Sequence, residues 1–386
     1  MIPYGRQNIT EDDIAAVVEV LRSDWLTQGP MVPRFEQTVA DKVGAKYAVA
    51  ANSATSALHI ACLALELGPG DWLWTSPNTF AASANCGLYC GAKVDFVDID
   101  PHTYNLSVKA LAEKLEHAEH LGTLPKIVVP VHFAGQSCEM AEIHALAQRY
   151  GFKIIEDASH AIGAQYKDKP VGSCIYSDIA VFSFHPVKII TTGEGGIALT
   201  NNANLAERMQ RLRSHGITRD LKQMQDTQQG AWFYEQIELG FNYRMTDIQA
   251  ALGVKQLERL EQFVTQRRHL AAVYDHSLAQ LPLKRPFQHQ STCSSFHLYV
   301  IQVDPKHSPL DRNALFAYLR KSGIGVNVHY IPVYKHPYYR KLNFAEIFCS
   351  EAEQYYANAI TLPLFFGLEA SQQSEIIEVL TKVLQK

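Results

Sequence analysis

The sequence carries little net charge for its length. Its 386 residues include 35 lysines and arginines and 39 aspartates and glutamates, which gives a formal net charge of −4. Proteins that hold nucleic acid or an anionic membrane by their overall charge are normally basic. We therefore expect no nucleic acid and no membrane among the partners, and any anionic ligand must be held locally by backbone N–H groups and a few cations.

Long apolar runs and clusters of metal ligands are also missing. No stretch reaches the ~20 apolar residues of a membrane-spanning helix. The first six residues show no apolar segment behind a basic start, which a secretory signal would have. The seven cysteines form no Cys-x-x-Cys pair and no His/Cys cluster at zinc spacing, which favours free buried thiols over disulfides or a metal site. We expect a cytoplasmic protein without a metal ion.

The order of strand and helix patterns indicates the fold class. Hydrophobic residues make up 47% of the chain and charged residues 19%, as in ordinary globular proteins, and the length suits two domains. Short runs rich in β-branched residues alternate with segments of helical spacing such as 56–67. The expected strands are 46–52, 71–77, 93–100, 126–133, 153–159, 178–185 and 195–202. Because several of these runs are apolar on both faces, we predict an α/β fold with a largely parallel sheet covered by helices on both faces.

Further signals locate helix ends and a second domain. We expect Thr10 to begin one helix, and Ser137 and Gly151 to begin and end another. The elements expected after the first domain are a long helical region at 246–281, a strand at 296–303, a helix at 310–321 ended by Gly323, a strand at 324–330 and two further helices. We predict a large α/β domain with an N-terminal helical arm over 1–260, packed against a smaller α+β domain over 261–386.

Three of the expected strands end in unusual residues, and active groups in such sheets collect beyond the carboxyl ends of the strands. The first end is Asn52-Ser53-Ala54-Thr55-Ser56-Ala57, a run of small residues between a strand and a helix. Free N–H groups and the helix dipole suit a phosphate there, although a plain helix cap gives the same pattern. The Gly-x-Gly-x-x-Gly fingerprint is absent from this turn, which disfavours a dinucleotide cofactor.

The second strand end, 154–160, contains Asp157 directly after an apolar run. Burying an acid there is costly unless the acid meets a positive partner. Asp157 is therefore either a capping residue or a carboxylate held ionised against a cation, such as a protonated pyridine nitrogen.

The third strand end, 181–188, contains Lys188 just before the glycine-rich segment 191–196. A lysine at a strand end usually extends to solvent. A lysine that loses its solvent can instead act as a neutral amine and form a Schiff base with an aldehyde. Together with the phosphate-type turn, Asp157 and Ser183, Lys188 fits pyridoxal 5'-phosphate (PLP), because the phosphate, ring nitrogen and aldehyde of PLP each find a candidate partner.

Seven motifs along nearly the whole chain carry a resemblance to a known family. They are Leu26–Gly29, Asn52–Leu58, Glu156–His160, Ser183–His185 with Lys188, Thr192–Gly196, Arg213–Gly216 and Gly240–Met245. In this order they resemble the DegT/DnrJ/EryC1/StrS sugar aminotransferases, which belong to the fold-type-I PLP enzymes. The resemblance implies a PLP-dependent nucleotide-sugar aminotransferase that forms a homodimer with active sites shared across the interface.

The resemblance also implies roles for individual residues. Lys188 would bind the cofactor covalently and act as the catalytic base, and Asp157 would pair with the ring nitrogen. The other implied cofactor contacts are to the phosphate (Ala54, Thr55 and Ser183), the ring face (Phe80), the phenolic oxygen (His160) and, from the neighbouring subunit, Asn242.

Within the family, the chain is most similar to the branch that acts in pseudaminic-acid biosynthesis. This similarity implies transfer of an amino group from L-glutamate to C4 of UDP-2-acetamido-2,6-dideoxy-β-L-arabino-hexos-4-ulose, a UDP-linked 4-keto-6-deoxy-N-acetylhexosamine. The implied substrate-binding residues are Tyr4, Asp24, Trp25, Leu26, Thr27, Ala54, Ser183, Asn242, Asn327, Val328, His329 and Tyr330. The segment 327–330 also fits a central strand of the small domain, and the two roles are compatible.

Three alternatives stay open. The same motifs are compatible with another nucleotide-linked keto-sugar, of the dTDP-, GDP- or UDP-4-amino-arabinose type. A PLP-dependent sugar dehydratase of the same fold would have histidine in place of the lysine, whereas Lys188 is present. A regulatory relative without activity would not need Asp157, Ser183 and Lys188.

Overall fold

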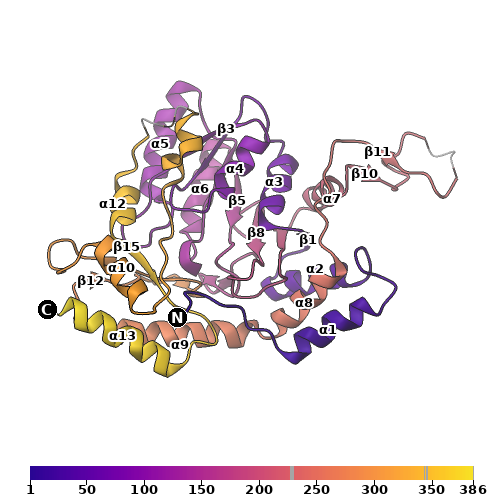
Figure 1. Ribbon diagram of the computed structural model, residues 1–386. Helices are drawn as coiled ribbons and strands as arrows, with labels where there is room; N and C mark the ends of the chain where they lie inside the picture. The colour runs from indigo at the N-terminus through magenta and orange to yellow at the C-terminus, as the bar shows by residue number, and fades with distance from the viewer. Residues whose placement is uncertain (227–229, 343, 345–346, 386) are drawn as a thin grey trace.

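The computed structural model describes residues 1–226, 230–342, 344 and 347–385, and its centre is a seven-stranded sheet (Figure 1). The strand order is β1-β9-β8-β5-β4-β2-β3. The strands are β1 (Tyr47–Ala51), β2 (Trp72–Thr75), β3 (Lys93–Phe96), β4 (Ile127–Val129), β5 (Lys153–Asp157), β8 (Ile179–Ser183) and β9 (Gly196–Thr200). Neighbours pair in parallel from β3 to β8, whereas β9 is antiparallel to both β8 and β1. Each strand lies within one of the seven expected runs, so the predicted, largely parallel sheet is confirmed.

Helices cover both faces of this sheet (Figure 1). Successive side chains of a strand point to opposite faces, and Leu73 and Trp74 of β2 accordingly belong to different hydrophobic cores. The helices on the face of Leu73 are α3 (Ala54–Ala64), α4 (Ala82–Tyr89) and α7 (Ala203–Leu212). The helices on the opposite face are α2 (Met31–Val43), α5 (Val108–Leu121), α6 (Met140–Tyr150) and α8 (Asp247–Glu258). The two-sided cover explains why the strands are apolar throughout.

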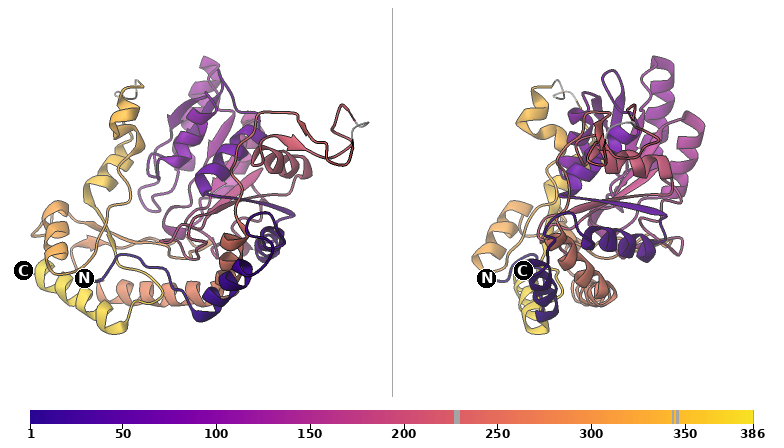
Figure 2. Two further views of the ribbon diagram at one scale, coloured as in Figure 1. Left: turned by 45° about the vertical axis from the view of Figure 1, so that its right-hand side comes forward. Right: turned by 90° about the vertical axis from the view of Figure 1, so that its right-hand side faces the viewer.

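A smaller antiparallel sheet lies in the C-terminal part of the chain. It consists of β12 (Leu283–Lys284), β14 (Tyr299–Val303) and β15 (Ala359–Leu362). The helices of this part are α9 (Leu260–Ser277), α10 (Arg312–Lys321), α11 (Pro337–Arg340), α12 (Ser350–Asn358) and α13 (Ala370–Leu384). Ile2 from the N-terminus joins the core that this sheet shares with α9, α10 and α13, and Figure 2 shows the N-terminus beside these elements. The proposed boundary between residues 260 and 261 falls at the start of α9 and stays a prediction.

A two-stranded arm projects from the body of the molecule beyond α7 (Figures 1 and 2). It contains β10 (Ile217–Thr218) and β11 (Glu235–Gln236), which pair in antiparallel fashion. The remaining short strands, β6 (Gln165–Tyr166), β7 (Lys169–Pro170) and β13 (Thr292–Cys293), form a third small sheet. Within the described residues, no helix combines the length and apolar character needed to cross a membrane.

Local capping chemistry explains several of the helix ends. Thr10 begins α1 (Glu11–Leu21) with a reciprocal capping box, in which Thr10 accepts from the N–H of Asp13 and the Asp13 carboxylate accepts from the N–H of Thr10. Gly151 ends α6 in the left-handed region, at φ 80°, as predicted. The prediction that Ser137 caps α6 is wrong. Its hydroxyl donates to the carbonyl of Cys138, and the helix begins only after Glu139.

Two predictions for the second half of the chain need correction. The segment 324–330 is not a strand, because only Ile324 and Asn327 form isolated bridges, to Ile2 and Thr361. The edge of β14 is taken by β15 instead, a strand that the sequence did not indicate. The helical region 246–281 is two helices, α8 and α9, which meet at Arg259.

Candidate active site

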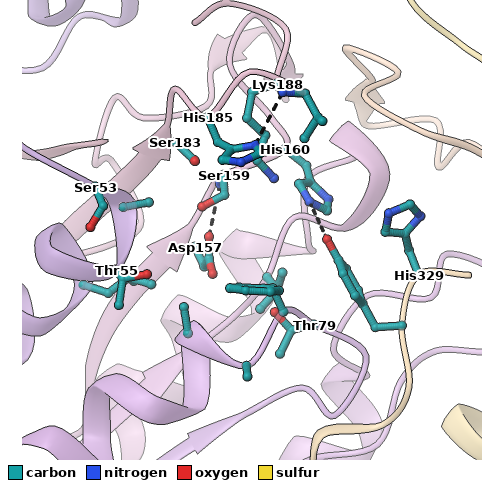
Figure 3. Close-up of a pocket in the computed structure, with 18 of the residues that line it drawn as sticks. Ser53, Thr55, Thr79, Asp157, Ser159, His160, Ser183, His185, Lys188 and His329 are labelled. Atoms are coloured by element: carbon teal, nitrogen blue, oxygen red, sulfur yellow. Dashed lines mark hydrogen bonds between the residues drawn. The ribbon is translucent and has the colours of Figure 1, made fainter. Parts of the chain in front are cut away.

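A cavity of about 1110 Å³ opens where the carboxyl ends of the parallel strands meet (Figure 3). Asp157 ends β5, Ser183 ends β8, and Asn52 to Ser56 follow β1. All of these residues line the cavity, together with Lys188 from the loop after β8. The parallel arrangement brings residues from distant parts of the sequence to one edge of the sheet.

One wall of the cavity is the N-terminus of α3. Ser53 caps this helix by accepting from the N–H of Ser56 at 3.1 Å. Among the hydrogen bonds of the described residues, the N–H groups of Ala54 and Thr55 have no acceptor. Gly196 of β9 passes directly behind this turn, and a Cβ on it would lie 2.3 Å from the nitrogen of Ala54. Free N–H groups at a helix N-terminus, with a hydroxyl on Thr55, form a site for a phosphate.

Asp157 contributes a buried carboxylate to the same cavity. Its exposed fraction is 5%, and both of its oxygens accept hydrogen bonds. Oδ1 accepts from the N–H of Ser159 at 3.1 Å, and Oδ2 accepts from Oγ of Ser83 at 2.5 Å. Donors on both oxygens stabilise the ionised form, which can therefore face a cation in the cavity.

Lys188 supplies an amine to the same cavity. Burial lowers the pKa of Lys188 to about 8, and the negative charge of Asp157 opposes part of this effect. A substantial fraction of the amine is therefore neutral near pH 8 and can act as a nucleophile or a base.

His160 and Tyr330 form a second polar group in the cavity (Figure 3). Nδ1 of His160 accepts from the N–H of Ala134 at 3.3 Å, and Nε2 lies 3.1 Å from the hydroxyl of Tyr330. Burial, assisted by the charge of Lys188, holds the pKa of His160 well below its usual value. The ring is therefore neutral, and because Nδ1 is an acceptor, Nε2 carries the proton and donates to Tyr330. Burial also raises the pKa of Tyr330, whose own proton then points away from His160.

The polar groups that line the cavity fit PLP. The cradle of N–H groups at α3 suits the phosphate, the buried carboxylate of Asp157 suits a protonated ring nitrogen, and the amine of Lys188 suits the aldehyde. Phe80, which is 63% exposed, also lines the cavity and offers an aromatic face. Among the described residues, no group of histidine, cysteine and acidic side chains could hold a metal ion.

The structure brings most of the predicted site residues to this cavity, and some lie elsewhere. The predicted residues that line it are Tyr4, Ala54, Thr55, Phe80, Asp157, His160, Ser183, Lys188, Asn327, Val328, His329 and Tyr330. Those that do not line it within one chain are Asp24, Trp25, Leu26, Thr27 and Asn242. Trp25 is 57% exposed and Asn242 is exposed as well. Their predicted contacts stay predictions.

Sequence reasoning missed several side chains of the cavity. The missed lining residues include Thr79, Ser159, Glu194, Gln249, His297 and His336, and His185 had no predicted role. His297 lies behind His160, with ring centroids 4.3 Å apart, and its buried Nδ1 has no partner among the described residues. Ser83 does not itself line the cavity, but it is hydrogen-bonded to two residues that do, Asp157 and Thr79. No motif marks it, because Asp157 is 74 residues away along the chain.

Known proteins are similar to the chain over its whole length. A model described as the DegT/DnrJ/EryC1/StrS aminotransferase family matches residues 7–381. The UDP-4-amino-4,6-dideoxy-N-acetyl-β-L-altrosamine transaminase of Campylobacter jejuni is 38% identical over 393 residues, which cover 100% of this chain and 98% of the relative.

Solved structures agree with this similarity. Helicobacter pylori PseC, an aminotransferase involved in the biosynthesis of pseudoaminic acid, has a TM-score of 0.89 and 32% identity, with coverage of 100% of this chain and 99% of that chain. The putative sugar aminotransferase Spr1654 from Streptococcus pneumoniae, in its PMP form, has a TM-score of 0.90 and 30% identity, with the same coverage. Spr1654 is also known in a PLP form.

Proposed function

The chain belongs to the DegT/DnrJ/EryC1/StrS aminotransferase family, and we propose that it transfers the amino group of L-glutamate to C4 of a UDP-linked 4-keto-6-deoxy-N-acetylhexosamine. That it is a PLP-dependent sugar aminotransferase follows from the family and from the PLP and PMP forms of a similar structure. The proposal adds the amino donor, the sugar and the carbon atom that is aminated. The substrate we propose is UDP-2-acetamido-2,6-dideoxy-β-L-arabino-hexos-4-ulose, as in pseudaminic-acid biosynthesis.

One observation supports the catalytic assignment most directly: the buried amine of Lys188, the carboxylate of Asp157 and the free N–H groups of the α3 turn surround a single cavity. PLP, when bound, supplies an aldehyde that takes up an amino group and a ring that accepts electrons from the reacting carbon. Asp157 keeps the proton on the ring nitrogen, and Ala54 and Thr55 hold the phosphate.

Lys188 is the base and acid of the proposed reaction. Its amine removes a proton from the α-carbon of glutamate in the first half of the reaction. In the second half it returns a proton to C4 of the sugar. The lowered pKa keeps enough of the amine neutral to take up a proton near pH 8. Tyr330, whose proton points away from His160, is a hydrogen-bond donor for an oxygen of the substrate.

Two observations support the identity of the sugar: the names of two similar proteins, and the residues that line one side of the cavity. The Campylobacter relative and the Helicobacter structure both carry names from this chemistry. Tyr4 and Asn327 to Tyr330 form the side of the cavity that belongs to the N-terminal segment and the C-terminal part of the chain. These residues are the proposed contacts to the sugar.

A homodimer with shared active sites is part of the proposal. Lys188 is the only lysine or arginine among the described residues that line the cavity, which leaves the diphosphate and the glutamate carboxylates without further cations. The projecting arm exposes large apolar side chains, among them Trp232 at 70% and Leu239 at 78%. Exposed apolar clusters of this kind mark binding surfaces. We infer that the arm packs on a second copy of the chain and brings Asn242 and neighbouring cations to its site.

The proposed function is tested by incubating the purified protein, PLP and L-glutamate with UDP-, dTDP- and GDP-linked 4-keto-6-deoxy sugars. Mass spectrometry of the products should show exchange of the ketone for an amine, fastest with the UDP-linked N-acetylhexosamine. Preferred amination of a dTDP- or GDP-linked sugar would contradict the substrate assignment. A product that has lost water instead would indicate a dehydratase.

A further inference from the structure

The carboxylate of Asp157 accepts a hydrogen bond from Ser83, which is in turn hydrogen-bonded to Thr79. Oγ of Ser83 lies 2.5 Å from Oδ2 of Asp157, and Oγ1 of Thr79 lies 2.7 Å from Oγ of Ser83. All three side chains are buried, with Ser83 fully inaccessible. A separation of 2.5 Å is typical of a strong, charge-assisted O–H···O⁻ hydrogen bond.

The chemistry of the groups fixes the direction of each proton. An ionised carboxylate can only accept, so the single hydroxyl proton of Ser83 goes to Asp157. Oγ of Ser83 can then only accept from Thr79. The carbonyl of Phe80, 3.4 Å from the same oxygen, is too distant to compete. With the N–H of Ser159 on the other carboxylate oxygen, every donor in this group stabilises the charged form of Asp157.

The position of Ser83 in the fold strengthens the same effect. Ser83 lies in the first turn of α4, an eight-residue helix, so the positive end of the helix dipole lies near the carboxylate. The preceding residues also carry Phe80 into the cavity. One segment, 79–83, therefore sets both an aromatic face of the cavity and the orientation of Asp157.

We propose that Ser83 is a positioning residue that fixes the orientation and the charge of Asp157 toward the ring nitrogen of PLP, and that Thr79 fixes Ser83 in turn. The inference rests on the role proposed above for Asp157. Ser83 does not line the cavity, so it acts through the carboxylate and not by contact with cofactor or substrate.

The test measures the affinity of the apoenzyme for PLP. Ser83→Ala should raise the dissociation constant of PLP about tenfold or more, since a hydrogen bond to a charged group is lost. It should also lower kcat with little change in the KM for the sugar. The matched control is Thr200→Val, which removes another fully buried hydroxyl that donates to the carbonyl of Asp178 at 2.7 Å. This control should leave PLP affinity unchanged.

A double-mutant cycle separates action through Asp157 from a general loss of structure. In an Asp157→Asn background, Ser83→Ala should add little to the loss of PLP affinity. A loss that adds in full, or no loss in the single variant, would overturn the proposal.

Substitutions of Thr79 test the positioning of Asp157 even if Ser83→Ala does not fold. Because Thr79 itself lines the cavity, Thr79→Val is compared in the wild-type and Asp157→Asn backgrounds. It should weaken PLP binding in the first and add little in the second, and Thr79→Ser, which keeps the hydroxyl, should restore the affinity. Equal PLP affinities of Thr79→Val and wild type would contradict the relay. These titrations use neither sugar nor amino donor, so an error in the proposed substrate leaves their outcome unaffected.

Discussion

Nε2 of His160 and the hydroxyl of Tyr330 lie 3.1 Å apart and join the end of β5 to the C-terminal part of the chain across the cavity. Because Nδ1 of His160 is occupied by the N–H of Ala134, this contact leaves the proton of Tyr330 free for another acceptor. The side chains thus form a chain of hydrogen bonds that points from the protein backbone into the cavity.

Removal of the Tyr330 hydroxyl should impair the use of the sugar and leave the fold intact. We expect Tyr330→Phe to lower kcat/KM for the keto-sugar about tenfold, because one hydrogen bond to the substrate is lost and His160 loses its partner. PLP affinity and thermal stability should stay close to those of the wild type. Tyr338→Phe, at an exposed tyrosine, is the control. Equal kcat/KM values for Tyr330→Phe and wild type would show that this hydroxyl does not contact the sugar.

The pH dependence of PLP binding should follow the protonation state of the Lys188 amine. Its pKa is lowered from 10.5 to about 8, and only the neutral amine reacts with an aldehyde. The rate at which the apoenzyme binds PLP covalently should therefore rise with pH and level off above about pH 8. An unperturbed lysine would give a rate that keeps rising toward pH 10.5.

Asp157→Asn provides the internal check on this profile. The charge of Asp157 raises the pKa of Lys188 against the effect of burial. Its removal should shift the plateau to lower pH. A shift to higher pH would contradict the electrostatic relationship between the two side chains.

Close packing behind the α3 turn should make Gly196 sensitive to substitution. A Cβ at this position would lie 2.3 Å from the nitrogen of Ala54 and 2.5 Å from its Cα. Gly196→Ala should therefore displace the turn, destabilise the protein by about 1–3 kcal/mol and weaken PLP binding. Gly68→Ala, where a Cβ meets nothing within 4 Å, should change neither property. Thermal unfolding and PLP titration of both variants measure the difference.

Shared active sites predict complementation between two inactive variants. Lys188→Ala and Asn242→Ala should each lose activity, the first completely. A mixed dimer of the two should contain one site with an intact Lys188 and an intact Asn242 from the neighbouring subunit. Co-expressed chains with different affinity tags should therefore regain activity in the doubly purified fraction. An inactive mixed dimer would place Asn242 in the site of its own chain.

The sequence was most informative at the ends of the central strands. The turn at Asn52 to Ala57, Asp157 and Lys188 each follow an apolar run, and parallel pairing forces such ends to the same edge of the sheet. Residue type was sufficient to predict a site there, because the strand pattern alone places each of these residues at the edge of the sheet.

Local sequence patterns do not predict contacts between segments that are distant in the chain. Ser83 looks like any small residue near a helix start, and its hydrogen bond to Asp157 joins residues 74 positions apart in the sequence. The segment 324–330 has the composition of a strand, but it forms only isolated bridges, from Ile324 to Ile2 and from Asn327 to Thr361 of β15. Asn242 and the residues 24–27 do not line this cavity within one chain, and their predicted contacts stay predictions.

The proposed function requires that the amine of Lys188 binds PLP covalently, and reductive trapping detects this bond. The enzyme is loaded with PLP, treated with sodium borohydride, digested and analysed by tandem mass spectrometry. We predict a single pyridoxyl label on the peptide that contains Lys188, and none in Lys188→Ala. A label on another lysine, or the same labelling of the Lys188→Ala variant, would show that Lys188 is not the residue that binds PLP.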